Sequence, residues 1–479
     1  MHSNLKPRKT NKSKRYQELD DNQMEHNKEN VDLINEKYCR VEKEGKALNT
    51  TADKKKTRFS HNYLTHTTIR ASPLSKESPE QNYRGFLNLL ILSLFVLLLR
   101  LAIENYTKYG LLITLPKLTG SKAEDFEWCF YSMTYTLMSV SFAFFIENIA
   151  ILTKSENLTF FLNVCNLNLC LIVPIYISWE KIPYPAISFY PLLIATIVWL
   201  KLISYALTNN DLRLELKQGN SVAAAEDSDS KNFKIENSIL CPTLVYQMTY
   251  PKTKVFRKRF FFKRIGEVII CSTAMMFLIN QYASPTLENS LQHYKEMNIL
   301  RLFERLLKLS IVSLLIWLLM FYAFFHSLLN GLAEVLRFGD RRFYQPWWNA
   351  SNISEYWRLW NNPVYDWGKR HIYLPLVINH KVSSQNAMLV VFLISAFLHE
   401  VLVGIPTHNI SGVAFFGMIG QIPLIYLTKW LQKLSEKYSK TKSEVFTTGN
   451  IIFWLSFCIF GQPAAVLHYY VEWVKRTRN

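Results

Sequence analysis

Residues 388–406, MLVVFLISAFLHEVLVGIP, form a continuous apolar run that holds a single ionisable pair, His399 and Glu400. A bilayer core of about 30 Å is crossed by about 20 helical residues, and a helix satisfies every backbone group of such a run within lipid. His399 lies 11 residues past Met388, which at about 1.5 Å per residue places it about 17 Å into the core. This stretch therefore predicts a membrane-spanning helix with an ionisable side chain near mid-depth.

The remainder of the chain after Arg84 repeats this pattern. Eight further runs are apolar enough, and about long enough, to cross a bilayer. The nine predicted spans are 86–103, 128–153, 159–178, 186–207, 265–283, 306–330, 388–406, 413–434 and 449–471. The expected fold is an all-α, polytopic membrane protein of about nine transmembrane helices.

Residues 1–84 differ sharply from the spans, because they are rich in Lys, Asn, Glu, Ser and Thr and poor in aromatic residues. Such a segment cannot bury enough apolar surface to offset its ordering entropy. We expect a disordered cytosolic tail at 1–84, which is either simply solvated or serves self-association or regulation. One membrane domain is expected to follow at 85–475.

The formal net charge of +18 is distributed in a way that predicts the orientation. Excess Lys and Arg marks cytoplasmic loops, and the loops 208–264, 331–387 and 435–448 carry it. The N-terminus is therefore expected in the cytosol and the C-terminus in the lumen, although the basic tail at 475–478 argues the other way. Nucleic-acid binding is not expected, since the basic residues flank apolar spans instead of forming one polar domain.

The loop 331–387 is unusually aromatic for a segment outside the spans. Its Trp and Tyr residues include Trp347, Trp348, Tyr356, Trp357, Trp360, Tyr365, Trp367 and Tyr373. Trp and Tyr favour the membrane interface, so we expect amphipathic helices that lie at this boundary. These helices serve either as a membrane anchor or as the lining of an entry path for a lipid or for acyl-CoA.

His399 is the leading candidate for chemistry. An ionisable group at this depth costs on the order of a few kcal/mol and indicates a functional site, although a histidine bonded to a neighbouring helix is the structural alternative. Burial favours the neutral imidazole, which can act as the general base for an alcohol that attacks a thioester. Ser395 shares the same helix face, so a Ser–His acyl-enzyme is conceivable; a thioester is already activated, however, and direct transfer needs only a base.

Two further polar residues within spans have both a functional and a structural interpretation. Glu400 points about 100° around the helix from His399, and it either assists the site or pairs with another span. Gln462 lies between a glycine and a proline, and it either donates a hydrogen bond to a substrate carbonyl or restores backbone bonding beside the proline. Most other polar residues within spans are expected to bond to neighbouring helices; they include Glu147, Asn163, Asn166 and His326.

Metal and cofactor sites are not expected from the sequence. None of the seven cysteines forms a CxxC pair, and no Cys/His spacing fits a zinc site. GxGxxG, Walker A, HExxH and GxSxG arrangements do not occur either. Dinucleotide-dependent, nucleotide-hydrolysing, zinc-protease and soluble-hydrolase functions are therefore disfavoured.

Two stretches resemble motifs of a known superfamily. Residues 343–349, FYQPWWN, resemble the FYxDWWN motif of the membrane-bound O-acyltransferases, and residues 395–400, SAFLHE, resemble their histidine-bearing helix. Within that superfamily the chain is similar to the type 1 diacylglycerol acyltransferases over about residues 85–475. Supporting stretches are 241–244, 257–260, 304–309, 338–341, 360–364, 420–424 and 461–463.

The resemblance implies a role for each matching residue. His399 would be the catalytic base, with Asn361 near the active site and Glu400 supporting the histidine or the acceptor. The implied substrate-binding residues are Tyr344, Trp347, Trp348, Asn349, Trp360 and Gln462, the last near the reacting carbonyl. The resemblance also implies a homodimer in the endoplasmic-reticulum membrane that esterifies diacylglycerol with acyl-CoA, which is a substrate and not a cofactor, to give triacylglycerol.

Two departures from the family pattern keep other functions open. Pro346 stands where the motif usually has Asp, which removes a carboxylate and a backbone N–H donor. Tyr365 stands where close relatives often have His. The alternatives are a sterol acyltransferase that makes steryl esters, a catalytically inactive lipid-binding relative and, from a different class, a transporter.

Overall fold

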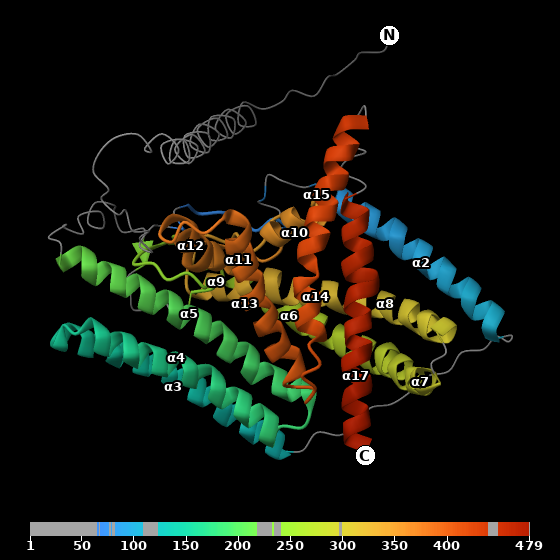
Figure 1. Ribbon diagram of the computed structural model, residues 1–479, viewed down its shortest axis with the longest axis horizontal. Helices are drawn as coiled ribbons and strands as arrows, with labels where there is room; N and C mark the ends of the chain where they lie inside the picture. Colours follow the sequence, from blue (N-terminus) through green and yellow to red (C-terminus); the bar gives the residue numbers. More distant parts are fainter. Residues whose placement is uncertain are drawn as a thin grey trace, which may run out of the picture. The chain divides into compact units, whose positions relative to one another are not determined.

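Helices account for nearly all of the regular structure in this protein (Figure 1). The computed structural model describes residues 65–66, 68–75, 78, 82–108, 123–217, 232–233, 241–296, 299–438 and 449–478. Strands β1 (Asn232–Phe233) and β2 (Tyr250–Pro251) form one short antiparallel pair. The all-α fold expected from the sequence is confirmed.

Eight helices, most of them long, precede residue 336. They are α2 (Arg84–Lys108), α3 (Ala123–Thr153), α4 (Glu156–Lys181), α5 (Pro185–Lys217), α6 (Lys258–Leu278), α7 (Ser284–Lys295), α8 (Ile299–Phe321) and α9 (Leu329–Val335). Two π-helical segments, η2 (Ile279–Ala283) and η3 (Tyr322–Leu328), join α6 to α7 and α8 to α9.

The second half alternates short interfacial-type helices with longer apolar ones. Its helices are α10 (Ile353–Trp360), α11 (Asn362–Gly368), α12 (Leu374–Ile378), α13 (Ser384–Gly404), α14 (Val413–Ile419), α15 (Gln421–Tyr438) and α17 (Gln462–Arg478). The 3-10 turn η4 (Trp347–Asn349) and the π-helical segments η5 (Lys369–Tyr373) and η6 (Trp454–Gly461) complete it.

Seven helical stretches within the described residues are long and apolar enough to cross a membrane. They are Ala123–Thr153, Glu156–Lys181, Pro185–Glu215, Ile299–Val335, Ser384–Gly404, Val413–Leu434 and Gly449–Arg476. The other two predicted spans, 86–103 and 265–283, correspond to α2 and to α6 with η2. The continuous apolar stretch of α2 is short, Arg84–Leu97, and the early part of α6 carries Lys263, Arg264 and Glu267. The count of nine therefore stays a prediction.

Helices α3, α4 and α5 pack against one another as a three-helix layer, drawn in teal and green in Figure 1. Polar side chains join the layer internally, as the sequence predicts for intramembrane polar groups. The side-chain amide N–H of Asn166 on α4 donates a hydrogen bond to the backbone oxygen of Ser139 on α3 over 3.0 Å. Glu147 of α3 forms an ion pair with Arg213 of α5. These two residues are thus inter-helix partners, whereas Asn163 bonds to Thr159 of its own helix.

The aromatic loop 331–387 folds into short helices because its sequence supplies their caps. The side chain of Asn352 accepts a hydrogen bond from the backbone of Glu355 at the start of α10, and Asn361 does the same for Val364 at the start of α11. Asparagine is among the preferred N-cap residues, and the proline after the second cap suits the first helical turn. The helices expected here are therefore present.

Residues 65–66 and 68–75, which lie in the predicted tail, make hydrogen bonds to the folded body. The backbone of Arg70 is bonded on both sides, to Gly339 and to Arg341. His66 is held by Asp340 and Thr243 at 2.8 Å each. Composition did not indicate this segment, because its partners lie about 180 to 270 residues away and are polar. Of the remainder of the predicted tail, only residues 78 and 82–84 are among the described residues.

Candidate active site

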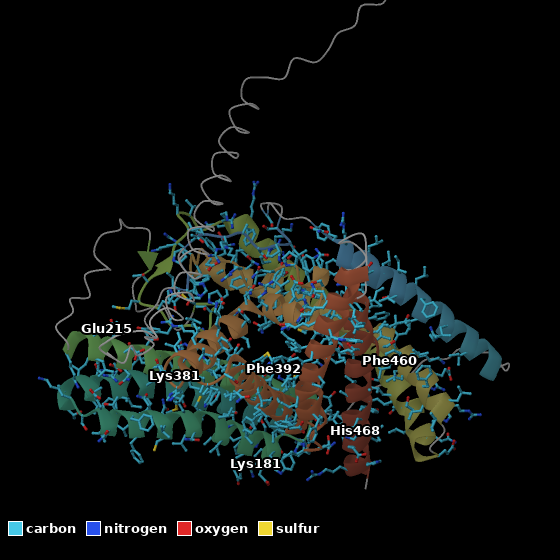
Figure 2. The ribbon with its side chains drawn as sticks, turned by 45° about the horizontal axis from the view of Figure 1, so that its top comes forward. Lys181, Glu215, Lys381, Phe392, Phe460 and His468 are labelled. Atoms are coloured by element: carbon cyan, nitrogen blue, oxygen red, sulfur yellow. The ribbon has the colours of Figure 1, made fainter. Side chains whose placement is uncertain are left out.

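His399 lies on α13, on the face that meets the aromatic core. Phe392 precedes it by seven residues, which returns to the same side of a helix after two turns. Phe392 packs against the core and meets Trp357 with ring centroids 6.0 Å apart. Figure 2 labels Phe392 among the central helices. His399 therefore shares a helix face with a residue of the aromatic core, although its own side chain is exposed, as are Leu393 and Phe397.

A hydrogen bond fixes which nitrogen of His399 carries the proton. Nδ1 lies 2.7 Å from the backbone oxygen of Ser395. A carbonyl oxygen only accepts, so Nδ1 must donate, and in the neutral ring the lone pair then resides on Nε2. Since Nδ1 is occupied in this way, the Ser395 hydroxyl at 3.5 Å is poorly placed to lose its proton to the ring. The geometry favours direct transfer over a Ser–His acyl-enzyme.

The imidazole lies deep among protein atoms and still keeps accessible surface. His399 is exposed, whereas Leu398 and Glu400 on either side of it are buried. The physical reason is local, because the small side chain of Ser395 precedes His399 on the same helix face and covers little of the ring. A general base needs this access, since the reacting hydroxyl must come within hydrogen-bond distance of Nε2.

Glu400 is committed to structural contacts. Its carboxylate accepts hydrogen bonds from the backbone N–H groups of Gly412 (2.9 Å) and Phe415 (3.1 Å). The Tyr469 hydroxyl donates a third bond to it over 2.8 Å. Glu400 thereby ties α13 to the start of α14 and to α17, on which Figure 2 labels the preceding residue, His468. Among the described residues no hydrogen bond joins it to His399, so its contacts favour a positioning role.

The FYQPWWN stretch fills the centre of the aromatic core. Tyr344, Trp347 and Trp348 are at most 1% exposed. Trp347 meets Trp317 and Trp360 edge-on at ring-centroid distances of 5.2 and 5.1 Å. Edge-to-face aromatic pairs of this kind add to the free energy gained by burial. These residues are therefore packing residues in this conformation, and direct contact with a substrate stays a prediction.

Tyr344 also takes part in a buried polar cluster that sequence reasoning missed. Its hydroxyl accepts from Ser72 at 3.0 Å and from the backbone of Leu74 at 3.3 Å. The phenol has one proton, which it can then give to Nδ1 of His326 over 2.7 Å. Burial raises the pKa of the Tyr344 phenol, which keeps that proton in place. His326 was expected to bond to a neighbouring helix, but its partner is the motif tyrosine.

Asn349 joins the motif to the first helix. Its side-chain oxygen accepts from the backbone of Gly85 over 2.6 Å, and its amide donates to the backbone oxygen of Asn82. A Cβ at Gly85 would lie 1.3 Å from the carbonyl oxygen of Trp348, so only glycine allows this approach. The start of α2 therefore packs closely against the FYQPWWN motif, and the side chain of Asn349 links the two by hydrogen bonds.

Trp360 and Asn361 mark the junction between α10 and α11. Trp360 stacks on Trp317, with ring centroids 4.7 Å apart and planes at 10°. The side-chain oxygen of Asn361 accepts a hydrogen bond from the backbone of Val364 and so caps α11. No described contact joins either residue to His399. Their predicted site roles are therefore neither supported nor opposed by direct contacts.

Gln462 begins α17, directly after the π-helical segment η6. Its side-chain oxygen is buried without a hydrogen-bond partner among the described residues. A buried polar atom left without a partner is unusual and asks for an explanation such as a ligand or a bound water. π-helical segments are also frequent at functional sites. Of the predicted substrate-binding residues, Gln462 and Trp347 each have such an atom among the described residues, the side-chain oxygen of Gln462 and the indole nitrogen of Trp347.

Tyr469 is a site residue that sequence reasoning did not single out. It lies seven residues beyond Gln462, about 10 Å further along the helix at 1.5 Å per residue, and it bonds to Glu400, next to His399. The contact joins residues 69 positions apart in the sequence. A tyrosine in an apolar helix gives no sign of such a partner, so only the packing of α13 on α17 identifies it.

Comparison with known proteins agrees with this arrangement. The model of the MBOAT, membrane-bound O-acyltransferase family matches residues 232–469. The chain is 37% identical to diacylglycerol O-acyltransferase 1A of Glycine max, over 86% of this chain and 82% of that protein. It is 38% identical to diacylglycerol O-acyltransferase 1-2 of Oryza sativa subsp. japonica, over 86% of each, and 37% identical to diacylglycerol O-acyltransferase 1 of Arabidopsis thaliana, over 86% of this chain and 77% of that one. Because this similarity extends over most of both chains, the protein belongs to the membrane-bound O-acyltransferase family, among its diacylglycerol O-acyltransferase 1 members.

Proposed function

We propose that this protein transfers the acyl group of an acyl-CoA to the hydroxyl of diacylglycerol, giving triacylglycerol and free CoA. The relatives named above carry this activity in their names. The observation that carries the assignment of chemistry is the Nδ1–H bond of His399 to the Ser395 carbonyl. It leaves Nε2 as a proton acceptor on an accessible side of α13.

The reaction then needs no covalent enzyme intermediate. Nε2 of His399 takes the hydroxyl proton as the diacylglycerol oxygen attacks the thioester carbonyl. The resulting tetrahedral centre collapses with loss of the carbon–sulfur bond, and the imidazolium returns its proton to the departing thiolate. The products are an ester and a thiol, so atoms and charge balance without a metal or a redox cofactor.

The remaining site residues take supporting roles in this proposal. The amide of Gln462 is suited to donate to the developing oxyanion, a contribution that is worth most where water is excluded. Asn361 holds α11 against the site through its cap. Glu400 acts as a positioning residue, because its three hydrogen bonds set the rotation of α13 on which His399 depends.

The two departures from the family motif are compatible with an active enzyme. Pro346 has φ −66°, the value to which the proline ring constrains φ, and the motif around it packs without interruption. Tyr365 lies in α11 with its backbone N–H bonded to Asn361 in the ordinary helical pattern. Neither residue contacts His399 among the described interactions. This favours catalysis over an inactive lipid-binding relative.

Location, orientation and assembly belong to the same proposal. We place the protein in the endoplasmic-reticulum membrane as a homodimer, with a cytosolic N-terminus and a lumenal C-terminus. The end of α17 lies at the opposite side of the helical body from α10, α11 and α12 (Figure 1). Since the loop that holds those helices is basic and expected in the cytosol, the C-terminus is expected on the lumenal side.

The molecular mass of the detergent-solubilised protein, measured by light scattering, tests the homodimer.

The decisive experiment pairs His399→Ala with His380→Ala in a host that makes no storage lipid. His380 is an exposed histidine in the turn after α12, so it matches the chemical change away from the site. Loss of a positioned general base costs about 10²- to 10⁴-fold in rate. Triacylglycerol is expected from the natural sequence and from His380→Ala, and only traces from His399→Ala.

Two outcomes would overturn parts of this proposal. Steryl ester in place of triacylglycerol would show that the acceptor is a sterol. Full activity in folded His399→Ala, with folding checked by the thermal unfolding midpoint, would remove the general-base role.

A further inference from the structure

A cavity lined by cationic side chains lies beside the start of α6, away from the residues assigned to acyl transfer. Its volume is about 310 Å³. Its walls are Ile69, Arg70, Ala71, Thr253, Lys254, Val255, Arg257, Gly339 and Arg341. Four of these nine side chains are cationic, and none of the nine is acidic. This composition fits an anionic ligand.

Three separate chain segments build the cavity, and backbone hydrogen bonds hold them together. Arg70 donates to Gly339 over 3.2 Å and accepts from Arg341 over 3.1 Å. Gly339 in turn donates to Pro251 over 2.8 Å, and Thr253 donates to Arg337 over 2.9 Å. The cationic side chains are therefore presented from a fixed frame, which lowers the entropy lost when a ligand is bound.

Two carboxylates behind the cavity hold its arginines but do not balance its charge. Glu334, fully buried, accepts from the backbone of Arg257 at 2.6 Å and from the Arg257 side chain at 3.1 Å, and it also pairs with Arg341. Asp340 lies 3.9 Å from Arg70. Four cations thus face two carboxylates. Two of these cations, Arg257 and Arg341, also lie within 5.1 Å of the Phe260 ring, together with Arg264, which pairs with Glu267.

Apolar side chains at the edge of the cavity indicate the kind of anion. Ile69 and Val255 line it and are 61% and 67% exposed. Phe262, in the first turns of α6, is 68% exposed. Exposed apolar residues interleaved with Lys and Arg are typical of a surface that enters the headgroup region of a bilayer. Clusters of such cations beside a membrane helix attract anionic lipids.

We propose that this cavity binds the phosphate of an anionic phospholipid headgroup, with the lipid chains lying along Ile69 and Val255. The same cations could meet the phosphates of CoA, which share this chemistry. The lipid is the better match, because its chains adjoin its phosphate as the apolar edge adjoins the cations, whereas in acyl-CoA the long pantetheine arm separates the phosphates from the acyl chain. The site is independent of acyl transfer, so it can be tested in the His399→Ala protein as well.

The test titrates dioctanoyl phosphatidylserine into the full-length protein in detergent and follows the thermal unfolding midpoint. A ligand that binds the folded state raises this midpoint in proportion to its occupancy, and dioctanoyl phosphatidylcholine should raise it less. Lys254→Gln removes one lining charge without touching either buried carboxylate. It should raise the lipid concentration for half-maximal effect about fivefold, the effect of one cation near an anionic surface. Arg70→Gln added to it should weaken binding further.

Lys429→Gln is the matched control, because Lys429 is an exposed lysine on α15 outside the cavity. It should respond like the natural sequence. Equal responses of Lys254→Gln, Lys429→Gln and the natural protein would overturn the proposal. A second titration with free CoA separates the two sources of phosphate. If Lys254→Gln weakened the CoA response and left the phosphatidylserine response unchanged, the lipid assignment would be wrong.

Discussion

At the scale of single residues, the neighbours His399 and Glu400 have different tasks because a helix turns about 100° between them. His399 is the proposed general base, whereas Glu400 accepts hydrogen bonds from the backbone at the start of the following helix. A Cβ at Gly404 would lie 2.9 Å from the Glu400 carboxylate, so glycine one turn later makes room for it. The sequence identified His399 as a candidate catalytic residue from its predicted depth in the membrane alone. It left Glu400 open, because the partners of a carboxylate depend on which helix lies opposite.

Tyr469→Phe tests the positioning role of Glu400. The change removes one hydrogen bond to a carboxylate, which should lower the free energy of unfolding by about 1.5–3 kcal/mol. It should also lower activity, since the rotation of α13 sets the direction of His399. Thermal unfolding and initial rates measured on the same preparation check both effects. Tyr426→Phe, an exposed tyrosine on α15, is the control; a Tyr469→Phe protein with normal stability would contradict the assignment.

At the scale of elements, the described part of segment 65–75 is attached to the loop before the FYQPWWN motif by polar contacts, with ring contacts of His66 and core packing of Leu74 beside them. Burial raises the pKa of the Asp340 carboxyl, but the hydrogen bond and charge of His66, aided by Arg70 and Arg342, outweigh burial and leave that pKa below its usual value of 3.8. The sequence could not predict this attachment. Polar residues far apart in the chain become partners only when the body that brings them together has folded.

Asp340→Asn should make the protein's stability less sensitive to acid. A carboxyl whose folded pKa is lowered contributes stability above its unfolded pKa, and that contribution is lost as the pH falls through the folded value. The natural protein should therefore lose stability more steeply than Asp340→Asn below about pH 4. Denaturation midpoints measured over this range check the slope.

Asp366→Asn is the control with the opposite sign. Burial raises the pKa of the Asp366 carboxyl above its usual value, so its contribution is present at low pH and lost as the pH rises through the folded value. Its removal should steepen the acid-induced loss of stability. If both variants changed the slope in the same direction, the lowered pKa of Asp340 would be disproved.

At the scale of the whole molecule, the aromatic core joins the motif loop to the membrane helices. Trp317 of α8, Trp347 of η4 and Trp454 of η6 come from distant parts of the chain and meet in one cluster. The sequence identified the aromatic residues of loop 331–387 and offered two roles for them, anchor or path lining. Trp347 and Trp348 are buried in the core in this conformation, and their contact with a substrate stays a prediction.

The expected orientation gives a prediction at this scale. A glycosylation sequon in a flexible extension after Asn479 should be modified, and the same extension placed before Met1 should remain unmodified. The physical reason is that the basic loops hold the N-terminal side in the cytosol. Mobility shifts that disappear on deglycosylation check the result. Modification of the N-terminal extension alone would reverse the proposed orientation.

The sequence by itself determined the all-helical membrane architecture, because apolar length and charge distribution act locally and are written along the chain. It also singled out His399, since an ionisable residue deep in an apolar run is costly wherever the run packs. Only the tertiary structure decided that Nε2 is the free nitrogen, that Glu400 holds α14 and α17, and that residues 65–75 close a cationic cavity. Each of these depends on contacts between segments distant in sequence or on one side-chain rotamer, and neither is encoded in composition or periodicity.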